Sequence, residues 1–288
     1  AQCLVGSEMC IRDRYLRDLL NRKSNNYQYN NNEEQAYRVI CDFINQWKQL
    51  YNSKNYYWSN GITIETMKSG SKAKGDAIKG KSDVDIFVSI TDSNNQHTVK
   101  EYYEDLYSFL KPQFATNSLR KQNVSIGISY NGCSIDVTPG KRVNHSTYVN
   151  YQYYNDHNIY SRKNDSNTLT NIQLHIDMVR NSGLTNEMMI LKIWRDCHNL
   201  ELPSIAIEII TCEVLKYQKT SSLYNNVKKV FESLRDTILT RKIIDPANSN
   251  NNIADTLTNL EKEIIRKTAI DSLSYDYGDS VNMSKIVW

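Results

Sequence analysis

An alternating segment, residues 83–90, constrains the fold of this chain more than any other stretch. Successive side chains of an extended strand point to opposite faces. One face of this segment is therefore apolar, with Val84, Ile86, Val88 and Ile90, while Asp83 and Asp85 project from the other face. The pattern predicts a strand in a sheet that is covered on one side and carries two carboxylates on the other.

A predicted hairpin supplies a third carboxylate. Residues 124–130 alternate strictly, and Asn131-Gly132 leads into a second run that contains Ile135, Asp136 and Val137. An Asn-Gly pair between two alternating runs is a strong hairpin signal. Asp136 has the opposite phase to its apolar neighbours. If this hairpin pairs with the strand of Asp83 and Asp85, three acids converge on one place.

Three neighbouring carboxylates require a counter-charge. Buried like charges repel, and a divalent cation relieves that repulsion. Ligands that are all oxygen atoms favour Mg²⁺ or Mn²⁺ over zinc. The sequence therefore predicts a metal site with Asp83, Asp85 and Asp136 as its ligands.

A Gly70-Ser71 turn precedes these acids, between an extended run at residues 62–67 and a predicted helix start. Backbone N–H groups and a hydroxyl at such a turn can hold a polyphosphate. Four nearby lysines would attract an anion: Lys72, Lys74, Lys79 and Lys81. Each feature alone is more typical of a structural role, but together they indicate phosphoryl or nucleotidyl transfer.

The order of the remaining segments predicts an α+β fold with two lobes. A helix with one buried face runs from Asn32, its predicted cap, to Leu50, and another covers residues 99–110. From about residue 171 only helices follow, the last from Ile253 towards Leu273. We therefore expect a core lobe with a mixed sheet at residues 15–165 and a helical lobe at residues 166–288. Residues 1–14 resemble a translated sequencing adapter, and we leave them out of the predicted fold.

The composition limits the setting of the protein. The chain has 288 residues, 40% of them hydrophobic, and no stretch approaches the roughly 20 apolar residues of a membrane-spanning helix. The six cysteines show no Cys-x-x-Cys spacing, which favours a reduced intracellular setting. A net charge of +3 neither requires nor excludes a nucleic-acid partner. We expect a cytoplasmic protein without a membrane partner.

The segment 69–75 and the acids that follow at 83–85 resemble the motif of polymerase-β-type nucleotidyltransferases. More narrowly, the chain is similar to the bacterial cGAS/DncV-like nucleotidyltransferases, or CD-NTases. The similarity continues beyond the acids and covers nearly all of the chain from about residue 15. The further matching blocks are residues 135–140, 191–194, 202–204 with Glu208, and 244–248 with Asn251-Asn252.

This resemblance implies an enzyme that joins nucleoside triphosphates, ATP or GTP or both, by a two-metal mechanism. Its product would be a cyclic di- or trinucleotide second messenger that activates an effector in anti-phage defence of the CBASS type. It also implies a polymerase-β-like lobe, an active site in the cleft beside the helical lobe, no DNA requirement and a monomer.

The resemblance also implies roles for single residues. Asp83, Asp85 and Asp136 would be the catalytic metal ligands, and Asp136 would help to deprotonate the attacking ribose hydroxyl. Gly70 and Ser71 would bind the donor triphosphate, and its distal phosphates would contact Lys192 and Ser204. Asp76 stands where the family usually has Thr, a departure that we expect to leave catalysis intact.

Two other functions remain open from the sequence. One is a nucleotidyltransferase that acts on RNA or a small molecule, which would share the acids and the Gly-Ser turn. The other is an inactive nucleotide-binding scaffold on the same fold, against which the three intact acids count. The bases used, the linkage and the ring size do not follow from the sequence.

Overall fold

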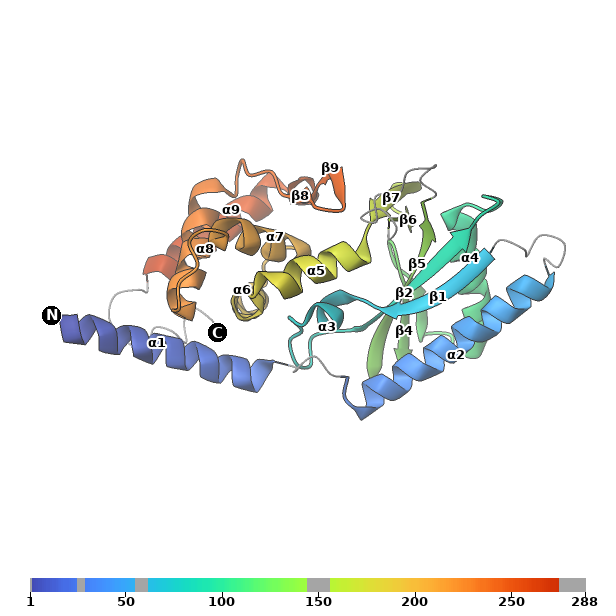
Figure 1. Ribbon diagram of the computed structural model, residues 1–288, viewed down its shortest axis with the longest axis horizontal. Coiled ribbons are helices and arrows are strands. Elements are labelled where there is room, and N and C mark those ends of the chain that lie inside the picture. The colour runs from blue at the N-terminus through green and yellow to red at the C-terminus, as the bar shows by residue number, and fades with distance from the viewer. Residues whose placement is uncertain (1, 25–28, 55–61, 144–155, 275–288) are drawn as a thin grey trace. The chain divides into compact units, whose positions relative to one another are not determined.

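The computed structural model describes residues 2–24, 29–54, 62–143 and 156–274 (Figure 1). Contacts divide the chain into two units. The helical unit comprises Ala1–Asn26, Gly75–Gly80 and Met178–Trp288, and the sheet unit comprises Tyr27–Lys74 and Lys81–Asp177. This division differs from the expected single boundary at residues 165 and 166, because two segments from the first third of the chain pack with the C-terminal helices.

A mixed sheet forms the centre of the sheet unit, as predicted. Strands β2 (Val84–Asp92) and β5 (Cys133–Arg142) are parallel, and the other described pairings of this sheet are antiparallel. The order is β1-β2-β5-β4-β3, and β6 pairs with both β5 and β7. The other strands are β1 (Ile62–Lys68), β3 (Leu119–Lys121), β4 (Ile126–Tyr130), β6 (His157–Ser161) and β7 (Ser166–Thr170). The predicted hairpin is confirmed: β4 and β5 pair around Asn131 and Gly132, which both have positive φ.

Helices α2 (Asn31–Lys54) and α4 (Val99–Leu110) contact each other and the sheet. Their buried residues share one core with the apolar face of β2, and Trp47 and Tyr102 are among the largest side chains in it. This packing leaves the acids of β2 on the opposite face, as the alternation predicts. The η1 turn (Lys111–Gln113) follows α4 at Pro112, where the sequence predicts the end of the helix.

The start of α2 differs from the prediction. Asn30, rather than Asn32, is the capping residue: its side-chain oxygen accepts a hydrogen bond from the Glu33 backbone, 3.0 Å away, and the Glu33 side chain accepts one from the Asn30 backbone at 2.9 Å. This reciprocal pair is a capping box. Leu50, expected on the buried face, is 48% exposed.

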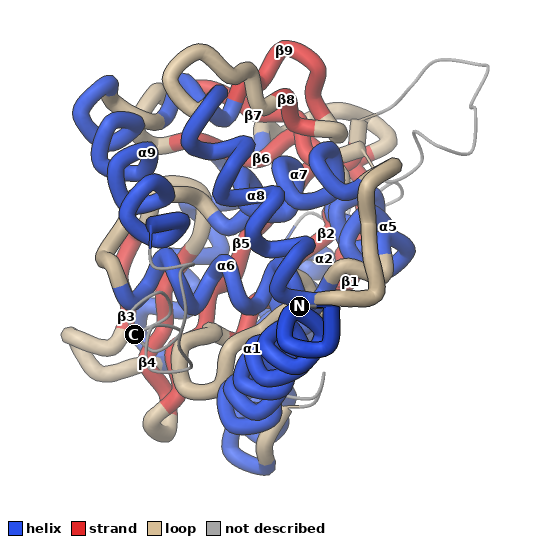
Figure 2. Tube along the Cα trace, turned by 90° about the vertical axis from the view of Figure 1, so that its left-hand side faces the viewer, coloured by secondary structure: helices blue, strands red, loops and turns tan. Residues whose placement is uncertain are grey.

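The helical unit has its own core. It is built from α6 (Thr185–Cys197), α7 (Ser204–Leu215), α8 (Leu223–Thr237) and α9 (Asn259–Ser274), with α5 (Ile172–Ser182) at its border (Figure 2). Trp194 is fully buried there, and its indole N–H donates to Ser272 at 2.9 Å. A small ribbon, β8 (Ile244–Asp245) and β9 (Asn248–Asn252), precedes α9. Of the helices described, none is both long and apolar enough to cross a membrane.

One predicted helix of this unit is two elements. The sequence predicts a single helix from Ile253 towards Leu273, but the η3 turn (Ile253–Thr256) ends before α9 begins. The break has a local cause. The Thr258 hydroxyl accepts from the Glu261 backbone at 3.2 Å, and the Glu261 carboxylate accepts from the Thr258 backbone at 2.6 Å. This capping box starts a new helix after the turn.

Helix α1 (Gln2–Lys23) packs against α6 and α8 within the helical unit. Its Asp13 accepts hydrogen bonds from the backbone N–H groups of Leu223 and Tyr224, at 3.3 and 2.8 Å, and from the Ser222 hydroxyl at 3.0 Å. Asp13 thus satisfies the N-terminus of α8, where a negative charge is favoured. The segment 1–14, left out of the predicted fold, therefore contributes a contact to it.

Candidate active site

The three predicted acids come from one corner of the sheet unit. Asp85 on β2 and Asp136 on β5 are direct partners in the parallel register, and Asp83 precedes β2 by one residue. Burial raises the pKa of Asp85 to about 7, and the charges of Asp136 and Asp83 add to the rise. The acids are thus close enough for the charge of one to raise the pKa of another. This agrees with the predicted pairing of the two strands.

The surroundings of Asp136 both raise and lower its pKa. Burial raises its pKa, followed by the charge of Asp83, whereas the charge of Arg120 and the nearby polar side chains of Gln122 and Ser125 lower it. One carboxylate oxygen, Oδ1, is buried and has no hydrogen-bond partner. A buried acceptor without a donor is costly unless something else satisfies it.

Gly70 lies directly against Asp85. It is the first residue of α3 (Gly70–Lys74) and has φ +66°. A Cβ atom at this position would lie 1.8 Å from the Oδ2 atom of Asp85, so the site requires glycine. The Ser69 backbone donates to the Asp85 carbonyl oxygen at 3.0 Å and fixes the turn to β2. Gly70 and Ser71 therefore lie at the same corner as the acids.

The donor set fits a hard divalent cation. Asp85 and Asp136 offer oxygen atoms only, and the lone Oδ1 atom of Asp136 is an acceptor that a cation can satisfy. A cation would also remove the repulsion that raises the pKa of Asp85. In the described ranges, however, no three His, Cys, Asp or Glu side chains are already gathered as a metal site. The carboxylates are neighbours without being a preformed ligand set, and metal binding stays a prediction.

Lys72 differs from the expected free, anion-attracting lysine. Its side chain is 3% exposed, its Nζ lies 2.5 Å from the Glu33 carboxylate and it sits 4.9 Å from the centre of the Tyr29 ring. The cation is therefore held on Glu33, the acid of the capping box of α2, inside the sheet unit. The charges of Lys74 and of Lys72 both lower the pKa of Asp85.

Lys192 lies on α6, in the helical unit, where it is buried between two acids. Its Nζ donates to Asp76 at 2.5 Å and to Glu208 at 2.9 Å, and all three side chains are nearly inaccessible. Asp76, the residue that departs from the family pattern, is thus an ion-pair partner of the predicted phosphate-binding lysine. Phosphate binding by Lys192 stays a prediction, and it requires the lysine to share or exchange these partners.

Ser204 is the first residue of α7, also in the helical unit. Its hydroxyl accepts a hydrogen bond from the Arg195 guanidinium at 2.8 Å, and the same guanidinium reaches the Leu202 carbonyl oxygen at 3.3 Å. The structure thus ties Ser204 to the end of α6. Its contact with phosphate stays a prediction.

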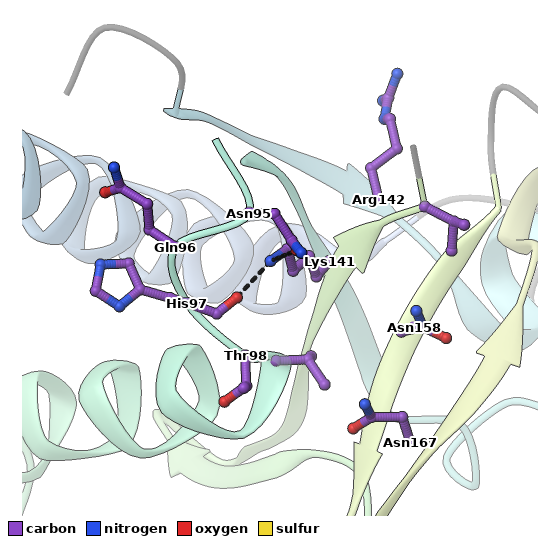
Figure 3. A pocket seen from close by; sticks show the side chains of 10 residues that line it. Asn95, Gln96, His97, Thr98, Lys141, Arg142, Asn158 and Asn167 are labelled. Atoms are coloured by element: carbon purple, nitrogen blue, oxygen red, sulfur yellow. Dashed lines mark hydrogen bonds between the residues drawn. The ribbon is translucent and has the colours of Figure 1, made fainter. Parts of the chain in front are cut away.

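A polar pocket of about 420 Å³ lies at the other ends of β2 and β5, away from the acids (Figure 3). Its one lysine, Lys141, is engaged: it pairs with the buried Asp92 at 3.2 Å and donates to Asn95 and to the His97 carbonyl oxygen. Amide side chains make up most of the remaining polar lining: Asn95, Gln96, Asn158 and Asn167. The pocket is therefore lined mainly by neutral polar side chains, with Arg142 as its second cation.

The residues around Asp136 were not anticipated from the sequence. Gln122, Ser125 and Arg120 all affect its pKa, and Gly127 is its direct partner on β4. One signal was present: Gly127 is the one residue of this alternating strand without a side chain, and an isolated glycine in a strand indicates a close approach by another group.

Known proteins resemble the chain in sequence and in fold. The cyclic AMP-AMP-AMP synthase of Escherichia coli (strain MS 115-1) is 25% identical, and the match covers 84% of each protein. The structure of E. coli MS115-1 CdnC with ATP has a TM-score of 0.73 at 19% identity and covers 95% of this chain and 96% of that one. No protein-family model matches the chain.

Two further structures have the same fold at lower similarity. Rhodothermus marinus CdnE, a c-UMP-AMP synthase, gives a TM-score of 0.60 at 14% identity over 87% of this chain and 93% of that one. Vibrio cholerae DncV, a cyclic AMP-GMP synthase, gives 0.60 at 16% identity over 78% and 68%. Together with the paired acids and the Gly70 turn, these findings show that the chain is similar to the bacterial CD-NTases, which are enzymes of the nucleotidyltransferase class.

Proposed function

We propose that this enzyme links nucleoside triphosphates and closes the product into a cyclic di- or trinucleotide. The pairing of Asp85 with Asp136, with Gly70 packed against Asp85, is the observation that carries the proposal. The relative that matches 84% of each chain is a cyclic AMP-AMP-AMP synthase, which makes ATP the first substrate and a cyclic trinucleotide the first product to test.

Asp83, Asp85 and Asp136 would hold two divalent cations, Mg²⁺ or Mn²⁺. Such ions, when bound, neutralise the triphosphate and favour the ionised form of the attacking hydroxyl. Asp136 is the acid that we assign to accept the proton of that ribose hydroxyl, because its raised pKa makes its carboxylate a better base than an exposed one.

The other site residues are assigned to the triphosphate. Gly70, which lacks a side chain, lets the backbone approach phosphate oxygens, and the Ser71 hydroxyl adds a donor. Lys192 and Ser204 are assigned to the distal phosphates. Because Lys192 donates to Asp76 and Glu208 in this structure, triphosphate would compete with those carboxylates for it.

We further propose that the product is a second messenger in anti-phage signalling of the CBASS type, read by an effector. The enzyme would then need neither DNA nor a membrane, and it would act as a cytoplasmic monomer. This part of the proposal rests on the relatedness to cyclic oligonucleotide synthases.

The direct test incubates the purified protein with all four nucleoside triphosphates and Mg²⁺ or Mn²⁺, treats the mixture with phosphatase and analyses it by mass spectrometry. We expect a phosphatase-resistant species with the mass of a cyclic di- or trinucleotide. The Asp85→Asn variant should form none. Ser129→Ala, an exposed position on β4, is the matched control and should behave as the unmodified protein.

Other outcomes would overturn the proposal. Linear products alone would favour an enzyme that extends RNA or modifies a small molecule. Nucleotide binding without any product, unchanged by Asp85→Asn, would favour an inactive scaffold.

A further inference from the structure

Gly127 leaves an opening beside Asp136. The two residues are direct partners on the antiparallel strands β4 and β5. Directly opposed residues place their side chains on the same face of a sheet, with Cβ atoms about 5 Å apart. At Gly127 no side chain occupies the place next to the Asp136 carboxylate.

The amide of Gln122 fills this opening. A Cβ atom on Gly127 would lie 2.7 Å from the Nε2 atom of Gln122, closer than real Cβ contacts. The same atom would lie 3.0 Å from Nε of Arg120. Two side chains thus cross β4 where it has no side chain of its own, and both act on Asp136, whose pKa they lower. Gln122 is half-buried, whereas Arg120 is exposed.

The orientation of the Gln122 amide is fixed by its neighbours. The Ser125 hydroxyl donates to Oε1 of Gln122 at 2.5 Å, which leaves the amide N–H groups for other acceptors. The Gln122 backbone donates to the Ser125 carbonyl oxygen at 2.9 Å. The hydroxyl of the fully buried Tyr103 donates to that oxygen at 3.0 Å and anchors the turn in the core.

We propose that Gln122 is a positioning residue for Asp136: its amide, set by Ser125 and admitted by Gly127, holds the carboxylate in the orientation that binds a divalent cation. The inference rests on the proposed function, because it takes Asp136 as a ligand of the cation. Second partners of metal-ligating carboxylates fix the ligand before the metal arrives, and their loss typically costs about 10- to 100-fold in metal affinity or activity.

The first test replaces the amide by a side chain of similar size without hydrogen-bonding groups, Gln122→Leu. Mn²⁺ binding is measured on the whole protein by the loss of the free-ion electron paramagnetic resonance signal, and nucleotide product is measured separately. We expect an Mn²⁺ dissociation constant raised by about 10-fold or more, and a synthesis rate lowered similarly at fixed metal. Excess Mn²⁺ should restore part of the rate. Ser129→Ala on the same strand should change neither quantity.

A second variant displaces the Gln122 amide while leaving Gln122 itself unchanged. Gly127→Ala adds one methyl group where Nε2 of Gln122 lies, and Gly127 does not have positive φ, so the backbone itself tolerates alanine. If the opening exists to admit Gln122, Gly127→Ala weakens Mn²⁺ binding as Gln122→Leu does. The double variant should then bind Mn²⁺ as tightly as whichever single variant has the lower affinity, because both changes remove the same interaction.

Several results would overturn the inference. Unchanged Mn²⁺ affinity in Gln122→Leu would remove Gln122 from the site. If Gly127→Ala lowers Mn²⁺ affinity as much in the Gln122→Leu background as in the unmodified protein, the two losses are additive. The two substitutions would then affect Mn²⁺ binding independently. Because Mn²⁺ binding is read without nucleotide, absence of cyclic product in the unmodified protein would contradict the proposed function and leave this test intact.

Discussion

The two units bury carboxylates in opposite ways. In the helical unit, Asp76 and Glu208 both accept hydrogen bonds from Lys192, and all three side chains are nearly inaccessible. In the sheet unit, Asp85 and Asp136 are neighbours in the register, and among the described residues no lysine or arginine forms a salt bridge with either. The first group is paired with a cation of its own chain, whereas in the described part of the chain the second group only has basic side chains nearby, without a salt bridge to them.

This difference separates carboxylates that are neutralised within the chain from carboxylates that we expect a ligand to neutralise. Buried ion pairs hold a fold together chiefly because removing one partner leaves the other uncompensated. Buried acids without a partner are unfavourable in the isolated protein, and they persist where a ligand supplies the missing charge. Burial and the charges of Asp136 and Asp83 raise the pKa of Asp85 to about 7, the direction expected for a carboxylate whose charge is not neutralised. We therefore expect catalysis and stability to conflict in the sheet unit.

The largest expected effect comes from Asp85→Asn. Synthesis should fall by about 1,000-fold or more, which corresponds to losing about 4 kcal/mol of transition-state stabilisation. The fold should not weaken, because one of two repelling charges is removed. Mass spectrometry of the product measures the loss of synthesis, and urea unfolding at pH 8 measures the stability. A variant that keeps a tenth of the activity would contradict the assignment.

The matching change in the helical unit is Lys192→Met. It leaves Asp76 and Glu208 buried without their shared cation, and we expect the free energy of unfolding to fall by about 3–5 kcal/mol. Urea denaturation measures this. Adding Asp76→Asn and Glu208→Gln to the same variant should recover most of the loss. If Lys192→Met alone changes stability by less than about 1 kcal/mol, within the range of an exposed ion pair, the group is not structural.

Asp85 should make the stability of the protein depend on pH. A carboxyl with a folded-state pKa near 7 and an ordinary unfolded pKa near 4 binds more protons in the folded state between these values. The free energy of unfolding therefore falls as pH rises through this window, by an amount on the order of 4 kcal/mol for Asp85. Urea unfolding at pH 4 to 8 should show a smaller decline in Asp85→Asn. Equal slopes would contradict the shift.

Asp13 provides a third arrangement and the smallest expected effect. Its charge is met by the backbone N–H groups at the start of α8 and by the Ser222 hydroxyl. Asp13→Ala should lower the free energy of unfolding by about 1–2 kcal/mol, the usual cost of losing a helix cap, and leave synthesis unchanged. Thermal unfolding measures the loss. Asp18→Ala, an exposed position on the same helix, is the control.

Local patterns predicted most of the sheet unit. The strands of Asp85 and Asp136 follow from period-two alternation, and their hairpin follows from Asn131-Gly132, because few other residue pairs adopt positive φ twice in succession. Even the cap of α2 missed its position by only two residues, since Asn30 and Asn32 offer the same chemistry and only the reciprocal bond with Glu33 selects one.

Non-local relations were out of reach. Lys192 and Asp76 are 116 residues apart, and no periodicity connects them. The segment 75–80 joins the helical unit because Ile78 packs in its core, which the lysine-rich sequence around it conceals. Gln122 acts on Asp136 only through the missing side chain of Gly127 and the register of β4 with β5. Predicting this contact requires the register of β4 with β5, and residue types alone do not determine that register.

The Asn131-Gly132 turn also orders the assembly of the site in time. It closes the shortest loop in the sheet, so β4 and β5 can meet within microseconds, and Gly127 faces Asp136 as soon as they do. Asp85 joins later, because the parallel pairing of β2 with β5 must first close a loop that contains α4 and two strands. In refolding we therefore expect Gln122 to support Asp136 before the pairing of β2 with β5 brings Asp85, and the repulsion between the two acids, into the site.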